Sequence, residues 1–409
     1  MNRIKQLMLC LGFILFLSGT STGQGTVTSS EPLRSPRVFL LDARRLQTTK
    51  EQVRNGDKNV AHAMSKLELD AKKAMTGGRY SVVSKLPTPP SGDKHDYMSQ
   101  APYFWPNPKT PDHLPYIRRD GERNPEINKI SDHQSMDKMV GAVDTLALAY
   151  LFSGNEAYAT KATELLRAWF VEPATRMNPN LQFAQFIPGV NTGRGIGLIE
   201  TRGLTRVVDA IGLLAGSKAW AESDQQNLER WFSEFLRWML ESSHGRDEAA
   251  ARNNHGTYYD LQVSSFALFV RKTDLAKQIL ETAKTKRIAT QIEPDGRQSL
   301  ELARTKAWSY SVGNLDGLML LAMLGERVGV DLWNYRTSDG RSIRCALDYL
   351  VPFAFGEKTW PDQQIGEWQP QILFPLIRRG APRFTDRQYQ AWAKKVPQMD
   401  VGDRSNLTH

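Results

Sequence analysis

Apolar residues recur at helical spacing along most of the chain. One stripe occupies positions i, i+4, i+7 and i+11, a spacing that places its members on one face of a helix. The segment "SGN" at 153–155 ends that helix, and a second apolar stripe continues to "EP" at 172–173. The alternation that is typical of strands is scarce, so the pattern predicts an all-α protein. The members of the first stripe are Met139, Val143, Leu146 and Tyr150.

The order helix, short break, helix recurs along the chain. Further breaks fall at 216–217, 271–273 and 325–329. Units of roughly 40 to 60 residues predict stacked antiparallel helix pairs. Six or seven such pairs fit a chain of 409 residues. The pairs either form an open solenoid or close into an (α/α) toroid whose inner helices surround a cavity.

One long segment without helical periodicity favours the toroid. Residues 85–126 are rich in proline, aromatic residues and charge. A loop of this length in a compact domain is usually functional or disordered, and its aromatic content argues against disorder. We therefore expect an ordered loop that walls a cleft. Its Tyr103 and Trp105 can stack on sugar rings or can simply pack the loop down.

The first residues predict an export signal. Arg3 and Lys5 form a basic start, residues 7–17 are apolar, and small residues follow; this pattern is typical of a cleaved signal peptide over 1–24. The apolar stretch is too short to span a bilayer, so we expect no stable membrane insertion after cleavage. Residues 25–409 are predicted to form a single domain. With Cys345 as the one cysteine left, a periplasmic or secreted bacterial protein without disulfides is expected.

The charge of the chain suggests a polyanionic partner. The formal net charge is +9, and removal of Arg3 and Lys5 lowers it to +7. A basic surface on an exported protein fits an acidic polysaccharide, although it can also serve solubility alone. The sequence carries no helix-turn-helix, zinc-finger or RNA-binding motif, so nucleic acid is not expected as a partner.

Candidate chemistry gathers in "RNNHGTYYD", residues 252–260. The segment precedes the apolar stretch "LQVSSFALFV" and therefore lies at the start of a helix. Amides at that position can cap free backbone N–H groups. Capping leaves His255 unexplained, as it does the adjacent Tyr258 and Tyr259, so we interpret the segment as part of a site.

A second polar cluster, "LELARTKAWSYSVGNLDG", follows about fifty residues later. Arg304 and Tyr310 are six positions apart, and a bend near Trp308 would bring them together. Taken singly, the arginine could be a surface charge and the tyrosine a core residue. Together with Asn254 and His255 they form a set that suits β-elimination from a uronic acid.

The logic of that reaction explains the residue types. The C5 proton of a hexuronate becomes acidic only when the neighbouring carboxylate is neutralised, which amides or arginine can do. A base then removes the proton while an acid donates to the departing O4. In mannuronate or glucuronate both groups lie on one face, so one tyrosine can serve twice. In guluronate they lie on opposite faces, and a histidine is the better base.

The residues also resemble a known family. "NNHGTYYDLQ" with "RTKAWSY" resembles the alginate lyase domain of polysaccharide lyases, and "HDYMSQAPYFWPNP" with "LPYIRRDGERNPE" resembles the Bacteroidetes-type polysaccharide lyase family 38. The resemblance implies an α/α toroid, favours seven helix pairs and implies cleavage of alginate or glucuronan. It also implies that Asn254 neutralises the substrate carboxylate, that His255 and Tyr310 transfer protons, and that Arg304 stabilises the tyrosinate or holds the substrate.

Further side chains are candidates for substrate binding, and no cofactor is needed. Glu248 can orient His255, pair with the substrate or be a solvated charge. The histidines are scattered along the chain, and none forms the His-x-x-x-His or His-x-His pair that would suit a metal site, so no metal is expected. The remaining candidates are Asn253, His133, Gln134, Lys138, Arg194, Arg202, Tyr103, Trp105 and Tyr259.

Two other functions compete with the lyase. A glycoside hydrolase on the same toroid would need two carboxylates, such as Asp144 and Glu248. A non-catalytic glycan-binding helical-repeat protein would explain the aromatic residues and the charge. It would leave the cluster of His255, Arg304 and Tyr310 without a role.

Overall fold

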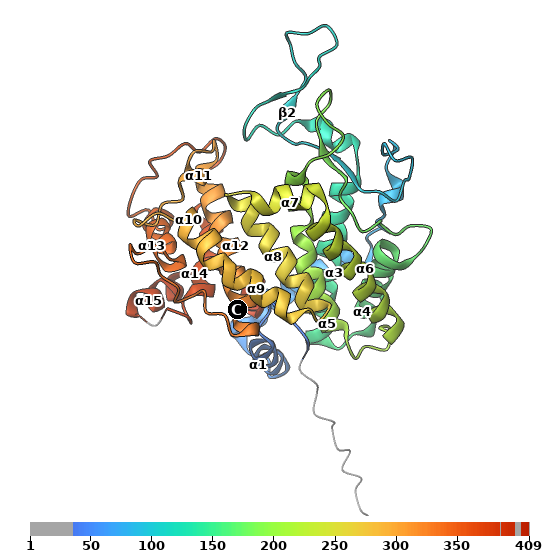
Figure 1. Cartoon of the computed structure of the whole chain (residues 1–409). Coiled ribbons are helices and arrows are strands. Elements are labelled where there is room, and N and C mark those ends of the chain that lie inside the picture. The colour runs from blue at the N-terminus through green and yellow to red at the C-terminus, as the bar shows by residue number, and fades with distance from the viewer. Residues whose placement is uncertain (1–35, 385, 397–401, 409) are drawn as a thin grey trace, which may run out of the picture. The chain divides into compact units, whose positions relative to one another are not determined.

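Helix hairpins build most of the protein (Figure 1). The computed structural model describes residues 36–384, 386–396 and 402–408, so the predicted signal peptide lies outside the described residues. Within them six pairs of consecutive helices can be followed, in the predicted range of six to seven. The pairs are α1 (Ala43–Arg54) and α2 (Lys58–Met75), α3 (Asp132–Ser153) and α4 (Glu156–Leu166), α5 (Leu204–Leu214) and α6 (Glu222–Glu241), α8 (Asn254–Phe269) and α9 (Thr273–Ala283), α12 (Ala307–Val328) and α13 (Ile343–Ala354), and α14 (Phe374–Gly380) and α15 (Arg387–Lys395).

Shorter helical segments fill the connections between the pairs. A π-helical turn, η3 (Arg167–Val171), extends α4, and another, η5 (Lys284–Ile288), extends α9 into α10 (Ala289–Gln291). The other short segments are η1 (Val82–Ser84), η2 (Pro125–Lys129), η4 (Gly195–Gly203), α7 (Ser243–Ala250), α11 (Ser299–Leu302), η6 (Pro370–Leu373) and α16 (Ser405–Thr408).

Local sequence sets where the helices begin and end. Asp42, Asp57 and Asn155 each accept a backbone hydrogen bond at the start of a helix, as N-cap side chains do. Gly154 closes α3 in the left-handed conformation, which glycine adopts at little cost. The break predicted at 153–155 is thereby confirmed, and those at 216–217 and 271–273 likewise fall between helices.

The helices α3, α5, α8, α12 and α14 contact one another in this order, and their partners pack outside them. Nearly every residue of α5 and α8 is buried, which is the pattern of helices surrounded by protein on all sides. This arrangement confirms the predicted (α/α) toroid. The residues from Pro36 onward form one compact unit.

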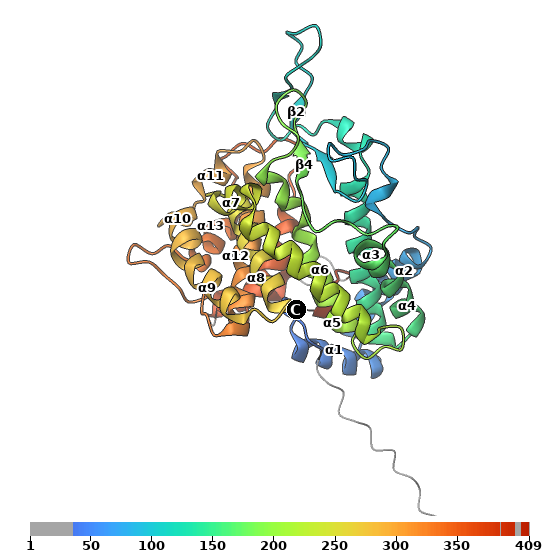
Figure 2. The same ribbon diagram turned by 45° about the vertical axis from the view of Figure 1, so that its right-hand side comes forward.

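Strands are few and short in the described residues. β1 (Met98–Gln100) pairs in parallel with β4 (Phe183–Phe186), and β2 (Phe104–Trp105) pairs antiparallel with β3 (Ile117–Arg118). Figure 2 shows β2 and β4 at the end of the helices from which the 101–124 segment projects. The long polar loop is therefore ordered, as expected.

The α12–α13 pair departs from the predicted pattern, because the break expected at 325–329 begins only at Gly329. α12 continues to Val328, and the next helix begins only at Ile343, because 330–342 are irregular, with one bend and one turn. Gly329 in the left-handed conformation ends α12. No helix in the described part of the chain has the length and apolar character needed to cross a membrane.

Candidate functional site

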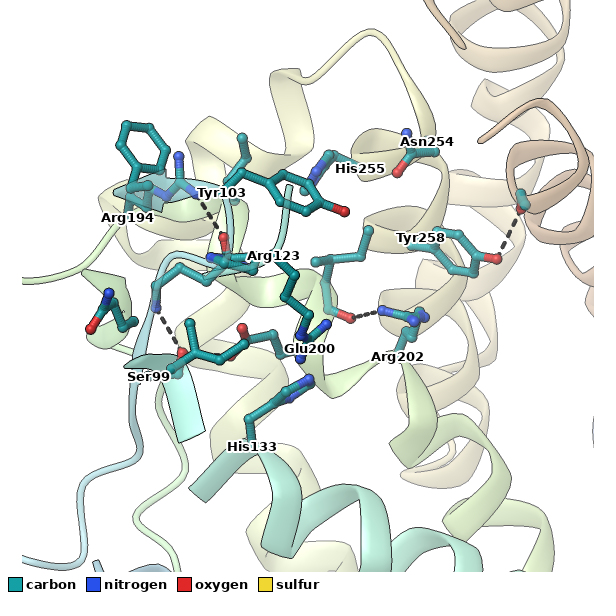
Figure 3. A pocket seen from close by; sticks show the side chains of 18 of the residues that line it. Ser99, Tyr103, Arg123, His133, Arg194, Glu200, Arg202, Asn254, His255 and Tyr258 are labelled. Carbon is teal, nitrogen blue, oxygen red and sulfur yellow. Dashed lines mark hydrogen bonds between the residues drawn. The ribbon is translucent and has the colours of Figure 1, made fainter. Parts of the chain in front are cut away.

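A cavity of about 780 Å³ opens where the projecting loop meets the start of the inner helices (Figure 3). In Figure 3, His133 at the start of α3 lies across the cavity from Asn254 and His255 at the start of α8. Among the described residues that line it, Glu200 is the single carboxylate, and the hydroxyls of Tyr97 and Ser99 donate to it. The cationic lining residues are Arg118, Arg123, Arg194, Arg202 and Arg304, joined by the imidazoles of His133 and His255.

The start of α8 presents the central motif. Asn253 is the N-cap residue, and its side-chain oxygen accepts from the backbone N–H of His255 at 3.3 Å. The capping role expected for one of the two asparagines is therefore confirmed for Asn253. Asn253, Asn254 and His255 all line the cavity.

A buried ion pair fixes the turn before this helix. Arg287 bonds both oxygens of Asp260, at 2.7 and 3.1 Å, and donates to the carbonyls of Ala249 and Ala251. Gly256 makes this possible, because a Cβ there would lie 2.1 Å from both the Ala251 carbonyl oxygen and the Arg287 guanidinium. The clamp holds the α7–α8 turn, and with it the motif, in one position.

Asn254 is oriented by a carboxylate that the motif did not reveal. Glu301 accepts from the Asn254 backbone N–H at 2.7 Å and from its Nδ2 at 2.8 Å. The pKa of Glu301 is raised by burial, which the two bonds from Asn254 oppose. With Nδ2 turned to Glu301, the amide oxygen and the second N–H of Asn254 remain for a ligand.

His255 is oriented in the same manner. Its Nδ1 lies 2.8 Å from Oε1 of Glu248, whose side chain is 1% exposed. A buried carboxylate at Nδ1 favours the tautomer that carries its proton there, which leaves Nε2 as a proton acceptor. Glu248 itself is absent from the cavity lining, so of its predicted roles the geometry supports the orienting one.

Arg304 and Tyr310 form one unit despite their spacing. The Arg304 guanidinium lies 3.8 Å from the centre of the Tyr310 ring, and its Nη2 donates to the tyrosine hydroxyl at 2.8 Å. The bend that joins them precedes Trp308, between α11 and α12. The Tyr310 hydroxyl in turn donates to the hydroxyl of Tyr103 at 2.9 Å.

The electrostatic setting of Tyr310 favours the neutral phenol. Burial raises its pKa most, the hydrogen bond and proximity of Tyr103 raise it further, and Arg304 partly opposes them. The negative charge of Asp120, whose carboxylate binds the same guanidinium, raises the pKa of Tyr310 further. A neutral phenol is a proton donor.

Four more of the predicted binding residues line the cavity. Arg194 lies over the Phe104 ring at 5.1 Å and donates to Gln185, and burial lowers its pKa to about 10. Arg202 lies 5.7 Å from the Tyr258 ring. His133 and Gln134 lie at the start of α3; His133 pairs with Asp137, and Gln134 donates to Asn128.

Besides Glu248, the structure places three further predicted binding residues away from the cavity lining. Tyr259 is buried in the core, where its hydroxyl donates to the Met239 carbonyl. Trp105 is held in the loop, with its indole N–H on the Glu122 carbonyl and Arg119 over its ring. Lys138 is exposed on α3, one helical turn beyond Gln134, and does not line the cavity.

Several lining or supporting residues were not singled out from the sequence. Arg118 and Arg123 lie in the loop motif "LPYIRRDGERNPE", where charge density was the available indication. Asp120, from the same motif, binds Arg304. Glu301 falls three positions before Arg304, a spacing of about one helical turn. Nothing in the sequence indicates that it contacts Asn254.

No group of three or more histidine, cysteine or acidic side chains suited to a metal ion occurs among residues 36–384, 386–396 and 402–408. The site instead joins amide, imidazole, guanidinium and phenol groups in a cationic cavity of a helical toroid. These features define the class of the protein as a polysaccharide lyase.

Comparisons with known proteins place it within that class. The family model for alginate lyase matches residues 81–360. The crystal structure of an alginate lyase from Bacteroides ovatus is similar with a TM-score of 0.87 and 39% sequence identity, over 91% of this chain and 99% of that one. The chain therefore belongs to the alginate lyase family.

More distant structures share the fold alone. Alginate lyase A1-III from Sphingomonas species A1 is 14% identical, with a TM-score of 0.55 over 89% of this chain and 94% of that chain. A variant of A1-III in complex with a tetrasaccharide gives a TM-score of 0.56 at 14% identity, over 87% and 91% of the two chains. Among curated proteins none matches the sequence.

Proposed function

We propose that the protein cleaves a β-1,4-linked polyuronate by β-elimination and leaves an unsaturated uronyl end, with alginate as the first substrate to test. The observation that carries the proposal is the unit of four side chains in one cavity. Asn254 and His255 are each oriented by a buried carboxylate, and Arg304 contacts the Tyr310 ring and hydroxyl. The alginate lyase from Bacteroides ovatus supplies the choice of polymer.

The charge of the cavity supports a polyanionic substrate. Five arginines line it against a single carboxylate among the described lining residues, and Glu200 is already engaged by two hydroxyls. Guanidinium groups bind carboxylates with strong, directional hydrogen bonds. Asn254, with its free amide oxygen and N–H, is the group that we assign to the carboxylate next to the reacting C5.

The hydrogen bonds around the two proton-transfer groups suggest their roles. His255, with Nδ1 on Glu248, offers Nε2 as the base for the C5 proton. Tyr310 is the acid for O4, because its raised pKa keeps it protonated. Arg304 then stabilises the tyrosinate that forms.

A second route on the same residues has its own support. With mannuronate or glucuronate, Tyr310 can remove the proton and return it to O4 on the same face. The close guanidinium of Arg304 favours the tyrosinate that this route needs first. In that case His255 would position the substrate instead of acting as the base.

The two carboxylates proposed for a glycoside hydrolase, Asp144 and Glu248, both bind other side chains. Asp144 binds Arg404 at 2.9 Å and is not part of the cavity lining, and Glu248 is committed to His255. Hydrolases of this kind need two carboxyl groups on either side of the scissile bond. Glu200 alone does not provide them.

The test offers polymannuronate, polyguluronate and glucuronan in turn, and follows the ultraviolet absorbance of a 4,5-unsaturated uronate. A lyase produces the chromophore on at least one polymer. Reducing ends without it would indicate a hydrolase, and binding without either product would indicate a glycan-binding protein. Loss of His255 distinguishes the two routes: if His255 is the base for every polymer, its loss should abolish all cleavage, and if Tyr310 serves both roles on mannuronate, cleavage of polymannuronate should only weaken.

We also infer that the enzyme acts outside the cytoplasm, as one domain over residues 25–409 released from a signal peptide over 1–24. The basic, apolar and small residues at the start of the sequence support this inference. Mass spectrometry of protein recovered from the periplasm or medium tests it. A mature chain that still begins with Met1 would contradict it.

A further inference from the structure

The hairpin of β2 and β3 reaches the catalytic unit through a carboxylate. Asp120, just after β3, binds Arg304 in a bidentate manner, with Nε at 3.1 Å from each carboxylate oxygen and Nη2 at 2.8 Å from Oδ1. Such fork geometry fixes the plane of a guanidinium, which a single bond would leave free to rotate. The same Nη2 donates to the Tyr310 hydroxyl.

The hairpin is anchored to the segment that carries Arg304. Thr305 donates to Asp120 three times, from its backbone N–H to Oδ2 and from its hydroxyl to both Oδ2 and the main-chain oxygen. Gly121 has φ +74°, and a Cβ at that position would lie 2.4 Å from the Thr305 hydroxyl oxygen. A glycine is therefore required for this close approach.

The same hairpin also contacts the tyrosine directly. The Arg119 backbone N–H donates to the Tyr103 carbonyl at 2.8 Å, beside the pairing of β2 with β3, so the two strands hold Tyr103 and Asp120 in a fixed relation. Tyr103 accepts a hydrogen bond from the Tyr310 hydroxyl. Asp120 holds the guanidinium of Arg304 over the ring of Tyr310.

We propose that Asp120 is a positioning residue that fixes Arg304 on Tyr310, so that the β2–β3 hairpin completes the proton-transfer machinery. Asp120 touches neither the ring nor the hydroxyl of Tyr310. It acts through the guanidinium, by geometry and by charge. The inference rests on the lyase activity proposed above and adds a residue to it.

The charge has a consequence that a structural residue would not have. The groups around Tyr310 are Arg304, Tyr103 and Asp120, with Arg118 on the far side of Asp120 at 2.6 Å. Arg304 lowers the pKa of Tyr310 and Asp120 raises it. Replacement of Asp120 by asparagine removes the negative charge, so the pKa of Tyr310 falls. If neutral Tyr310 is the acid, the alkaline limb of the kcat profile moves to lower pH.

The experiment compares Asp120→Asn and Asp120→Glu with wild type on the polymer that wild type cleaves. We expect Asp120→Asn to lower kcat by about 10²-fold, as for a misplacement of about 1 Å in a catalytic group. KM should change much less, the alkaline limb should shift to lower pH, and Asp120→Glu should recover part of kcat.

Asp224→Asn is the matched control. Asp224 binds Arg167 with two bonds of 2.7 Å and also accepts from the Ala221 backbone, in a clamp of the same kind at the start of α6. It should change thermal stability without moving the pH profile. Equal profiles for Asp120→Asn and wild type would overturn the proposal, as would a kcat loss matched by Asp224→Asn.

Failure of the proposed function and failure of the variant to fold give different results. If wild type forms no unsaturated product on any polymer, the proposed function fails, and the role of Asp120 in catalysis fails with it. If Asp120→Asn does not fold, Asp120→Ala assayed with added formate takes its place, because a small carboxylate can occupy the vacated position. Recovery of kcat by formate supports the positioning role, and a folded Asp120→Ala enzyme with wild-type kcat overturns it.

Discussion

Replacement of Glu248 by glutamine tests how His255 is prepared for proton transfer. The two side chains meet at 2.8 Å between Oε1 and Nδ1, and Glu248 is 1% exposed. Glutamine keeps the size but not the charge. Its oxygen can still accept from Nδ1, or its amide can donate to Nδ1 and force the proton onto Nε2, where the base must be free.

The magnitude follows from the charge that is lost. When His255 takes up a proton, the imidazolium faces a carboxylate at contact distance. Two unit charges about 4 Å apart interact by about 4 kcal/mol at an effective dielectric constant of about 20. At about 1.4 kcal/mol per tenfold change, kcat should fall by about 10³-fold.

The assay is the rate of unsaturated-uronate formation at saturating polymer, with KM measured alongside. Asp209→Asn serves as a control, because Asp209 is also a buried carboxylate, accepts three backbone N–H groups and does not line the cavity. A Glu248→Gln enzyme within about threefold of the wild-type kcat, or one no slower than Asp209→Asn, would refute the argument; the predicted loss is about 10³-fold.

Three other changes have definite expectations. Tyr310→Phe should abolish the chromophore while the polymer still binds, measured by calorimetry, and full activity would remove Tyr310 from the mechanism. Glu301→Gln should lower kcat/KM by about 10- to 100-fold, since a hydrogen bond to a charged group contributes about 1.5–3 kcal/mol; an unchanged value would show that Asn254 needs no such partner. Asp209→Ala should lower the free energy of unfolding by about 3–5 kcal/mol in a denaturant titration, because it strands three buried N–H groups. A loss below about 1 kcal/mol would contradict that role.

Much of the fold could be predicted from periodicity. The helix breaks near Gly154, Gly216 and Lys272 follow from glycine and polar residues between apolar stripes. These are local properties, so the sequence alone reveals them. The irregular stretch at 330–342 differs, because its apolar residues pack against the core without forming a helix, and their spacing resembles a helical stripe.

The site residues also divide into those that a local motif reveals and those that only the fold brings together. His255 and Tyr310 could be identified because their neighbours in the sequence form dense polar motifs. The carboxylates that orient the site are distant from their partners: Asp120 lies 184 positions from Arg304, and Glu301 lies 47 from Asn254. Only the packing of loop and helices brings each pair together, and a single sequence carries no trace of those contacts.

The aromatic candidates show a second limit. The sequence offers Tyr259 and Trp105 as sugar contacts and leaves packing open as the alternative, and in the structure their polar atoms are bonded to main-chain carbonyls. An aromatic residue stabilises a core or a loop by the same burial that makes it a good sugar platform. Tyr103 differs because its hydroxyl meets that of Tyr310.

The central claim is that cleavage occurs by elimination. Parallel measurement of new double bonds and new reducing ends, in one reaction of the full-length mature enzyme with alginate, tests it most directly. The account predicts one double bond for every new reducing end throughout the reaction. New reducing ends that accumulate without double bonds would contradict it.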